Sequence, residues 1–229
     1  MIVTHKNTGT LGDFIALLPL VSSLKKREKY IHLSLPKRYS VFSGLKNFLL
    51  YQNFIDEVDF LDTKGDLDIQ AHRCDEPRPC RARCEALRLG LSIDENLILN
   101  YKDVDIPFDK LSMPIVIDKN TPNNDRPIMR RCGKFPDDRY KYIKFDKNFD
   151  INYNVNLCVK NTNPIYSCLT GFGVLLQFFK SIDLNIVWFN REDQKSLGVP
   201  FYEETKPFYD TYFDKPNICL KYWKDIKND

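Results

Sequence analysis

The chain has 229 residues, of which 43% are hydrophobic and 13% aromatic, enough to bury a core without disulfides or metals. Its 34 basic and 31 acidic residues give a net charge of only +3, so charge alone indicates no nucleic-acid or membrane-surface partner. No apolar run approaches the roughly 20 residues that cross a bilayer, and the start lacks the pattern of a secretion signal. These features predict a soluble, cytoplasmic protein.

The first third of the chain alternates strand and helix patterns. Residues 1–7 and 30–36 are typical of strands, and between them the apolar positions from Phe14 to Leu24 recur every three or four residues, as in an amphipathic helix. Further strands are expected at 54–62 and 66–72, and helices at about 39–50 and 79–91. Strands that alternate with helices predict βαβ units around a parallel sheet, so we expect a Rossmann-like domain over residues 1–108.

The second half begins after a proline-marked crossover near residues 103–113. The segment PIVID (114–118) is expected to be a strand, and the basic stretch RPIMRRCGKFPDDRYKYI (126–143) a loop whose PDD segment starts a short helix. The Asn-rich residues 145–160 are expected to end in a strand, VNLCV. A second strand, glycine turn and apolar helix follow at 165–182, and then a strand, NIVWF.

The domain limits follow from these elements. We expect a reduced Rossmann-like domain over residues 109–200. The tail, 201–229, is expected to be irregular or to pack back on the first domain. The fold class is therefore predicted to be α/β with two lobes, the second one reduced.

Two glycine-containing turns precede helices, G-T-L-G-D (9–13) and T-G-F-G (170–173). Such turns let a ligand approach the backbone, and free amides at a helix start favour an anion or a substrate hydroxyl, although neither turn has the GxGxxG dinucleotide spacing. Each also has a purely structural interpretation. Asp13 is a favoured N-cap residue, worth about 1 kcal/mol in that role, and the second turn serves helix packing.

Charged and metal-ligating residues leave similar alternatives open. The basic residues Arg126, Arg130, Arg131 and Lys134 suit diphosphate oxygens, or else form an ordinary solvated loop. His5 and His32 are interpreted as core or edge histidines.

The seven cysteines are an odd number in a chain that needs no staples, so they are expected to be free thiols. His72, Cys74, Cys80 and Cys84 lack the CxxC hairpin of a usual zinc site, and buried or idle thiols are the default interpretation.

The opening GTLGDFIALLPLVSSLKK resembles that of the ADP-heptose:lipopolysaccharide heptosyltransferases, a family of inverting, metal-independent GT-B glycosyltransferases. The matching residues are Gly12, Asp13, Pro19, Leu24 and Lys25. Three later segments resemble the family in the expected order: CEALRLGLSIDEN, RPIMRRCGKFPDDRYKYI and LTGFGVLLQFF. Phe172 stands where the family pattern has a polar residue.

The resemblance implies two GT-B lobes and sugar transfer from a nucleotide diphosphate sugar to a glycan or another hydroxyl acceptor, with no cofactor or metal. It makes Asp13 the general base on the acceptor hydroxyl, within an acceptor-side loop that includes Thr10 and Gly12. The donor-binding residues it implies are Arg126, Arg130, Arg131, Lys134, Thr170, Gly171 and Gly173. The alternative is a catalytically inactive nucleotide-sugar-binding or scaffold protein on the same fold. A nucleic-acid partner is not favoured.

Overall fold

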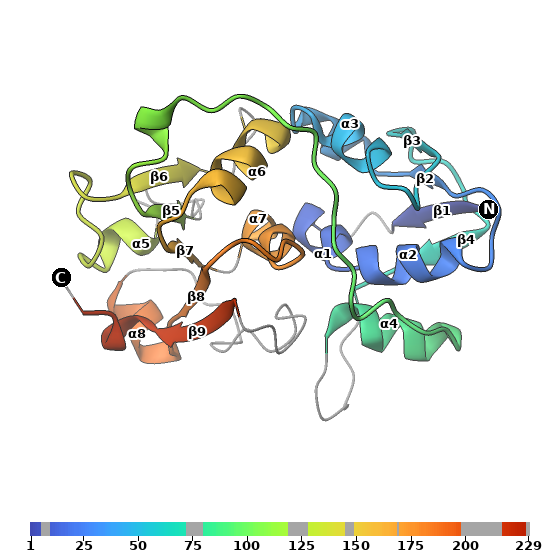
Figure 1. Cartoon of the computed structure of the whole chain (residues 1–229). Helices are drawn as coiled ribbons and strands as arrows, with labels where there is room; N and C mark the ends of the chain where they lie inside the picture. The colour runs from blue at the N-terminus through green and yellow to red at the C-terminus, as the bar shows by residue number, and fades with distance from the viewer. Residues whose placement is uncertain are drawn as a thin grey trace.

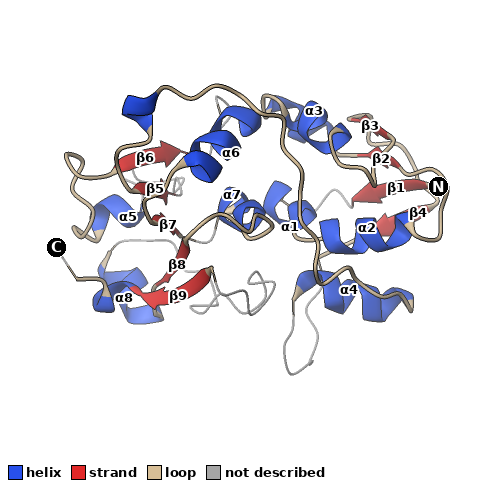
Figure 2. Ribbon diagram, in the orientation of Figure 1, coloured by secondary structure: helices blue, strands red, loops and turns tan. Residues whose placement is uncertain are grey.

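The protein folds into two lobes, each built around one parallel β-sheet, and a connecting segment, residues 90–107, runs from the first lobe to the second (Figure 1). The structure is a computed structural model and describes residues 1–5, 10–71, 80–118, 128–144, 149–168, 170–197 and 217–227. Figure 2 shows the two sets of strands well separated, with helices around each. The predicted α/β class is therefore confirmed.

The first lobe contains, among the described residues, a four-stranded sheet in the order β3-β2-β1-β4. All its strand pairs are parallel, and Val3 at the centre lies opposite Leu33 on one side and Leu67 on the other. The strands are β1 (Ile2–His5), β2 (His32–Ser34), β3 (Glu57–Asp59) and β4 (Leu67–Ile69), and the helices are α1 (Leu11–Ile15), α2 (Leu18–Lys25), η1 (Lys37–Val41), α3 (Leu45–Leu50) and α4 (Arg81–Leu89).

Two helices predicted as continuous are divided in this lobe. The apolar stretch after Thr10 forms α1 and then α2, with Pro19 in the first turn of α2, where its missing N–H costs no helix hydrogen bond. The second stretch is divided at Gly44, whose φ of 75° is left-handed and favours glycine.

The second lobe contains, in its described part, a five-stranded parallel sheet in the order β6-β5-β7-β8-β9. The strands are β5 (Ile115–Asp118), β6 (Lys141–Lys144), β7 (Ile165–Ser167), β8 (Leu184–Trp188) and β9 (Ile218–Tyr222), and the helices are η2 (Phe108–Lys110), α5 (Ile128–Arg131), α6 (Ile151–Lys160), α7 (Gly171–Leu176), α8 (Arg191–Ser196) and η3 (Trp223–Asp225). This sheet has more described strands than the first, so the predicted reduction of the second lobe is not confirmed.

Several elements of this lobe differ from the prediction. Residues 151–160 form helix α6 rather than ending in a strand, because the carboxylate of Asp150 caps the helix and Ile151, Val155 and Cys158 bury one face at helical spacing. In the basic stretch the helix lies at 128–131 and not at the PDD segment, and 141–144 adds an edge strand. In the described part of the tail, residues 218–222 form strand β9, which pairs with β8. The return of the tail to the first lobe stays a prediction.

The connecting segment is fastened to both lobes by buried amide side chains. Gln52 of the first lobe accepts from Asn100 N–H at 2.9 Å and donates to Asn100 C=O at 2.9 Å. Asn156 of α6, fully buried, accepts from Val104 N–H at 2.9 Å and donates to Lys102 C=O at 2.8 Å. Burial strengthens hydrogen bonds of this kind, so they fix the backbone of the connecting segment against both lobes.

One hydrophobic core extends through both lobes. A continuous cluster of buried side chains includes Phe14 and Leu33 of the first lobe together with Ile115 and Phe172 of the second. A smaller cluster around Val116 and Val187 packs beneath α5 and η3. Because the main core crosses the boundary, the lobes are packed together by apolar burial as well as by the connector.

Two other features bear on the sequence predictions. Cys84 is disulfide-bonded, so the expectation of free thiols is wrong for that residue, whereas Cys80, Cys132, Cys158, Cys168 and Cys219 are free. Within the described residues, no helix is both long and apolar enough to span a membrane.

Candidate functional site

The two predicted glycine turns lie in different lobes and meet at the boundary between them. A Cβ atom added to Gly12 of α1 would lie only 2.9 Å from the Cα of Gly171 at the start of α7. In Figure 1, α1 and α7 lie next to each other at the centre of the molecule. Glycine at position 12 is therefore what allows the two backbones to approach so closely.

Asp13 is held in place by a capping box at the start of α1. Thr10, not Asp13, is the N-cap, and its hydroxyl accepts from Asp13 N–H at 3.3 Å. One carboxylate oxygen of Asp13, Oδ2, accepts in return from Thr10 N–H at 2.6 Å and from the Thr10 hydroxyl at 2.9 Å. A capping role for Asp13 is thus present in the structure, in the N3 position rather than the predicted N-cap.

The other oxygen of Asp13 forms an ion pair with Arg81, the first residue of α4. Arg81 Nη1 lies 2.5 Å from Asp13 Oδ1, and the side chains are 20% and 18% exposed. The guanidinium orients the carboxylate and balances its charge, while the partial exposure leaves Asp13 within reach of a small molecule. Sequence reasoning missed Arg81. Its one signal was a cation at a helix N-terminus, where the helix dipole disfavours positive charge.

His5 ends strand β1 close to this group and is buried, in agreement with its interpretation as a core histidine. Its Nδ1 lies 3.1 Å from the hydroxyl of Tyr39. Burial lowers the pKa of His5 to about 4, although Asp13 opposes the shift, and burial raises the pKa of Tyr39 to about 12. Both side chains are therefore neutral at pH 7, and the His5 ring packs against Phe14, which follows Asp13 in α1.

The second-lobe turn has a tight internal structure. Thr170, 6% exposed, caps α7 by accepting from Gly173 N–H at 2.9 Å. A Cβ atom on Gly173 would collide with the Ser167 hydroxyl, so this glycine lets α7 pack on β7. Phe172 is fully buried and packs edge-on against Phe149, with ring centroids 4.6 Å apart. The interpretation of the turn as a packing device thus has direct support.

The predicted cationic cluster is largely engaged with the second lobe itself. Arg131 Nη1 donates to Leu197 C=O at 2.8 Å, and Lys134 Nζ donates to the carbonyls of Lys224 and Ile226, at 3.2 Å to the first. Arg130 is the more accessible cation, 42% exposed, with its guanidinium carbon 4.2 Å from the centre of the Tyr142 ring. Arg126 lies outside the described residues, as does Gly9.

The N-terminus of α5 already has an anionic partner from the protein. Asp118, buried at the end of β5, accepts from Met129 N–H at 3.0 Å and Arg130 N–H at 3.1 Å. The carboxylate satisfies these amides and repels a second anion. A diphosphate at this edge would therefore depend on side chains more than on the α5 amides.

A zinc site receives no support from the described cysteines. Cys84 is disulfide-bonded and offers no thiolate, and Cys80 is a buried free thiol. His72 and Cys74 lie outside the described residues. Elsewhere in the described part, no three histidine, cysteine or acidic residues gather in a group that would hold a metal ion.

Comparison with solved structures identifies what the two-lobed arrangement resembles. A glycosyltransferase family 9 protein from Veillonella parvula superposes with a TM-score of 0.54 over 96% of this chain and 85% of that one, at 11% identity. The chain shares the fold of these glycosyltransferases. The E. coli heptosyltransferase WaaC, solved with ADP, gives a TM-score of 0.53 over 97% of this chain and 93% of that one, at 10% identity.

A third structure is larger. TibC, an iron-containing dodecameric glycosyltransferase from enterotoxigenic E. coli, gives a TM-score of 0.54 at 11% identity over 95% of this chain and 63% of that one. No protein-family model and no curated protein matches the sequence. The resemblance to heptosyltransferases is thus supported at the level of the fold.

Proposed function

We propose that the protein is a glycosyltransferase of the heptosyltransferase-like type, which transfers a sugar from a nucleotide diphosphate sugar to an acceptor hydroxyl. The observation that carries the proposal is the position of Asp13, a partly exposed carboxylate of the first lobe at the point where α1 meets α7 of the second. In a two-lobed glycosyltransferase fold, a base at this boundary is in reach of an acceptor on one side and a donor on the other.

Asp13 supplies the chemistry of the acceptor side. Its Oδ1 atom contacts Arg81 and keeps a second lone pair, which accepts the proton of the acceptor hydroxyl. The freed oxygen then attacks the anomeric carbon, and the bond to the diphosphate breaks on the opposite face, so the configuration inverts. The nucleoside diphosphate leaves with the bonding electrons. No metal or cofactor is assigned a role, and Thr10 and Gly12 shape the loop beside the acceptor.

The donor side belongs to the second lobe in this proposal. Support for a nucleotide donor comes from the similarity in fold to WaaC, which was solved with ADP. Thr170, Gly171 and Gly173 lie at the start of α7, which meets α1 at Gly12. Among the described cations, Arg130 is assigned to the diphosphate first, since Arg131 and Lys134 already donate to backbone carbonyls. Arg126 stays a candidate from the sequence.

The test is Asp13→Asn, which keeps the size of the side chain but removes the base. Wild type and variant are incubated with a panel of nucleotide diphosphate sugars, and release of the nucleoside diphosphate is measured with and without glycan acceptors. Loss of the base should lower turnover by roughly 10²- to 10⁴-fold. Stabilisation by ADP in thermal denaturation should be the same in both, because the donor side is intact.

Asp105→Asn is the matched control, since Asp105 is an exposed carboxylate on the connecting segment. It should leave turnover unchanged. Full activity of Asp13→Asn would show that another group takes the proton. Unchanged rates in the presence of EDTA would agree with a metal-independent reaction.

The alternative, a catalytically inactive nucleotide-sugar-binding protein, also has an observation in its favour. Both oxygens of Asp13 have partners inside the protein, Thr10 and Arg81, as they would in a purely structural role. In that case ADP would stabilise the wild type, yet no donor in the panel would be cleaved or transferred. Cytoplasmic location stays a prediction under either function.

A further inference from the structure

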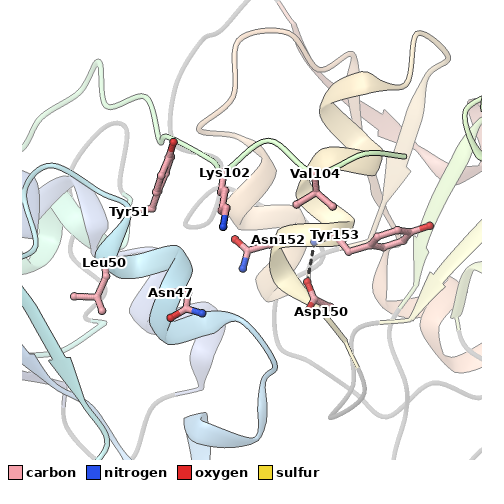
Figure 3. A pocket seen from close by; sticks show the side chains of 8 residues that line it. All are labelled: Asn47, Leu50, Tyr51, Lys102, Val104, Asp150, Asn152 and Tyr153. Atoms are coloured by element: carbon pink, nitrogen blue, oxygen red, sulfur yellow. Dashed lines mark hydrogen bonds between the residues drawn. The ribbon is translucent and has the colours of Figure 1, made fainter. Parts of the chain in front are cut away.

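A cavity of about 490 Å³ opens between the lobes on the side where α3 and α6 lie together, next to the connecting segment. Figure 3 shows it from close by. It takes residues from all three elements, and its polar and aromatic lining consists of Asn47, Tyr51, Lys102, Asp150, Asn152 and Tyr153. None of these residues has a part in the function proposed above.

The lining combines flat apolar surfaces with amide groups. Tyr51 and Tyr153 line the cavity from opposite lobes, together with the apolar residues Leu50 and Val104. In Figure 3 the Tyr153 ring points away from Tyr51, so Tyr51 is the aromatic ring on the first-lobe side. The amides of Asn47 and Asn152 each carry both donors and acceptors. A tyrosine ring beside amide groups suits a ligand that has both apolar C–H faces and hydroxyl groups.

The charges of the cavity balance each other. Lys102 reaches from the connecting segment toward Asn152 (Figure 3), and Asp150 is the one acid among the lining residues. The Asp150 carboxylate already accepts from Tyr153 N–H at 2.8 Å and from the Ser43 hydroxyl at 3.2 Å. One cation and one anion leave no net attraction for a multiply charged ligand such as a nucleoside diphosphate.

We propose that this cavity binds an uncharged saccharide unit, namely a non-reacting sugar of the glycan acceptor. The identification of this sugar as part of the acceptor rests on the proposed function, whereas the binding of a sugar is inferred only from the residues that line the cavity. A hexose unit presents an apolar C–H face to Tyr51 or Tyr153 and hydroxyl groups to the amides and to Lys102. Pockets that bind small ligands commonly combine an apolar lining with a few placed polar groups in this way.

The cavity is also joined by packing to the boundary where Asp13 lies. Phe149 precedes Asp150 and packs on Phe172, which follows Gly171, and Gly171 faces Gly12 of α1. A sugar that touches α3, α6 and the connecting segment at once favours the arrangement in which both lobes form these contacts. Occupation of the cavity therefore favours the alignment that Asp13 needs.

Direct binding tests the proposal without any transfer reaction. Methyl glycosides of glucose, galactose, mannose and N-acetylglucosamine are titrated into the full-length protein, with ADP as the charged comparison, and binding is followed by saturation-transfer NMR. At least one glycoside should bind the wild type. Tyr51→Ala should weaken its binding by about tenfold, equivalent to about 1.4 kcal/mol.

Two further variants make the result specific. Val104→Trp fills the cavity and should abolish binding of the glycoside even if Tyr51→Ala has little effect. Tyr30→Ala is the matched control, because Tyr30 is 49% exposed against 50% for Tyr51 but lies outside the cavity. It should leave binding unchanged.

Three outcomes would overturn the proposal: no glycoside binds, binding survives Val104→Trp, or ADP competes with the glycoside for this cavity. Asp13→Asn separates this proposal from the transfer reaction, since glycoside binding should persist in that variant. Failure of every donor assay would refute the proposed function, and glycoside binding would still decide whether the cavity is a sugar site.

Discussion

At their shared boundary the two lobes have the same local backbone arrangement, but one carries charged side chains there and the other a buried aromatic ring. In each, a strand is followed by a short glycine-containing helix capped by a threonine, Thr10 for α1 and Thr170 for α7. The first lobe places the charged pair of Asp13 and Arg81 at its turn, and the second places the fully buried Phe172. A shared fold therefore fixes where the turns lie and leaves their chemistry to a few side chains.

The largest expected effect on stability concerns Phe172. Phe172→Ala removes a fully buried ring from the core shared by the lobes and should lower the free energy of unfolding by about 3–5 kcal/mol, measured by urea denaturation. Phe108→Ala is the control, because Phe108 is 85% exposed, and it should change stability by less than about 0.5 kcal/mol. Equal small effects would mean that the second-lobe turn is not part of the core.

A pH titration of stability tests the buried wall of the first lobe. The pKa of His5 is about 4 in the folded protein and 6.5 without burial, so between these values the unfolded chain binds a proton that the folded chain does not. The free energy of unfolding should therefore fall as the pH drops from 6.5 to 4, by on the order of 3 kcal/mol in all.

His5→Gln, which keeps a partner for Tyr39, should flatten the slope in this window. The hydrogen bond from Lys25 lowers the pKa of Asp56 below 3.8, so Asp56 is protonated at a pH below this window. Identical slopes in wild type and His5→Gln would rule out His5 as the origin.

Gly12→Ala tests the close approach of the lobes. The added methyl group would lie 2.9 Å from the Cα of Gly171, so one backbone must move, at a cost of about 1–3 kcal/mol of stability. Gly173→Ala is the matched comparison, because its methyl group collides with Ser167 inside one lobe. Only Gly12→Ala should increase the radius of gyration in small-angle scattering, and equal radii would contradict a contact between lobes at this point.

The smallest effect is expected from the basic cluster of the second lobe. Lys134→Gln removes a charged donor to the carbonyls of Lys224 and Ile226 and should lower the free energy of unfolding by about 1 kcal/mol. ADP affinity should stay within about twofold for Lys134→Gln and fall further for Arg130→Gln, in calorimetric titration. A larger loss of affinity for Lys134→Gln would move the diphosphate contact from Arg130 to Lys134.

Elements that depend on local pattern were predictable from the sequence. The strands of the first lobe, the crossover and both glycine turns follow from apolar spacing and from the positions of glycine and proline. Residues 151–160 were misjudged because asparagine, valine and cysteine have weak helix propensity, whereas the cap by Asp150 and the burial of one face decide in favour of a helix. Strand β9, in the described part of the tail, was not predicted because it forms by pairing with β8, far away in the sequence.

The site was predictable only in part, for a similar reason. Asp13 stands out in the sequence beside two glycines, and its neighbour Gly12 lies where α1 meets α7. Its partner Arg81 lies 68 positions later, and the engagement of Arg131 and Lys134 with backbone carbonyls depends on residues near 197 and 224–226. Such contacts are set by tertiary packing, on which local spacing carries no information.

The hydrogen bonds from the side-chain amides of Gln52 and Asn156 to the backbone of the connecting segment affect how the protein would bind a ligand. A rotation of one lobe that displaces the connecting segment would break hydrogen bonds made by the buried side chains of Gln52 and Asn156. Wide opening of the lobes therefore costs free energy even without substrate. A flexible two-lobed protein must fix the positions of its lobes when it binds a ligand, whereas in this protein folding has already fixed much of that arrangement. A protein fastened in this way is preorganised, and less of its binding energy is consumed in closing.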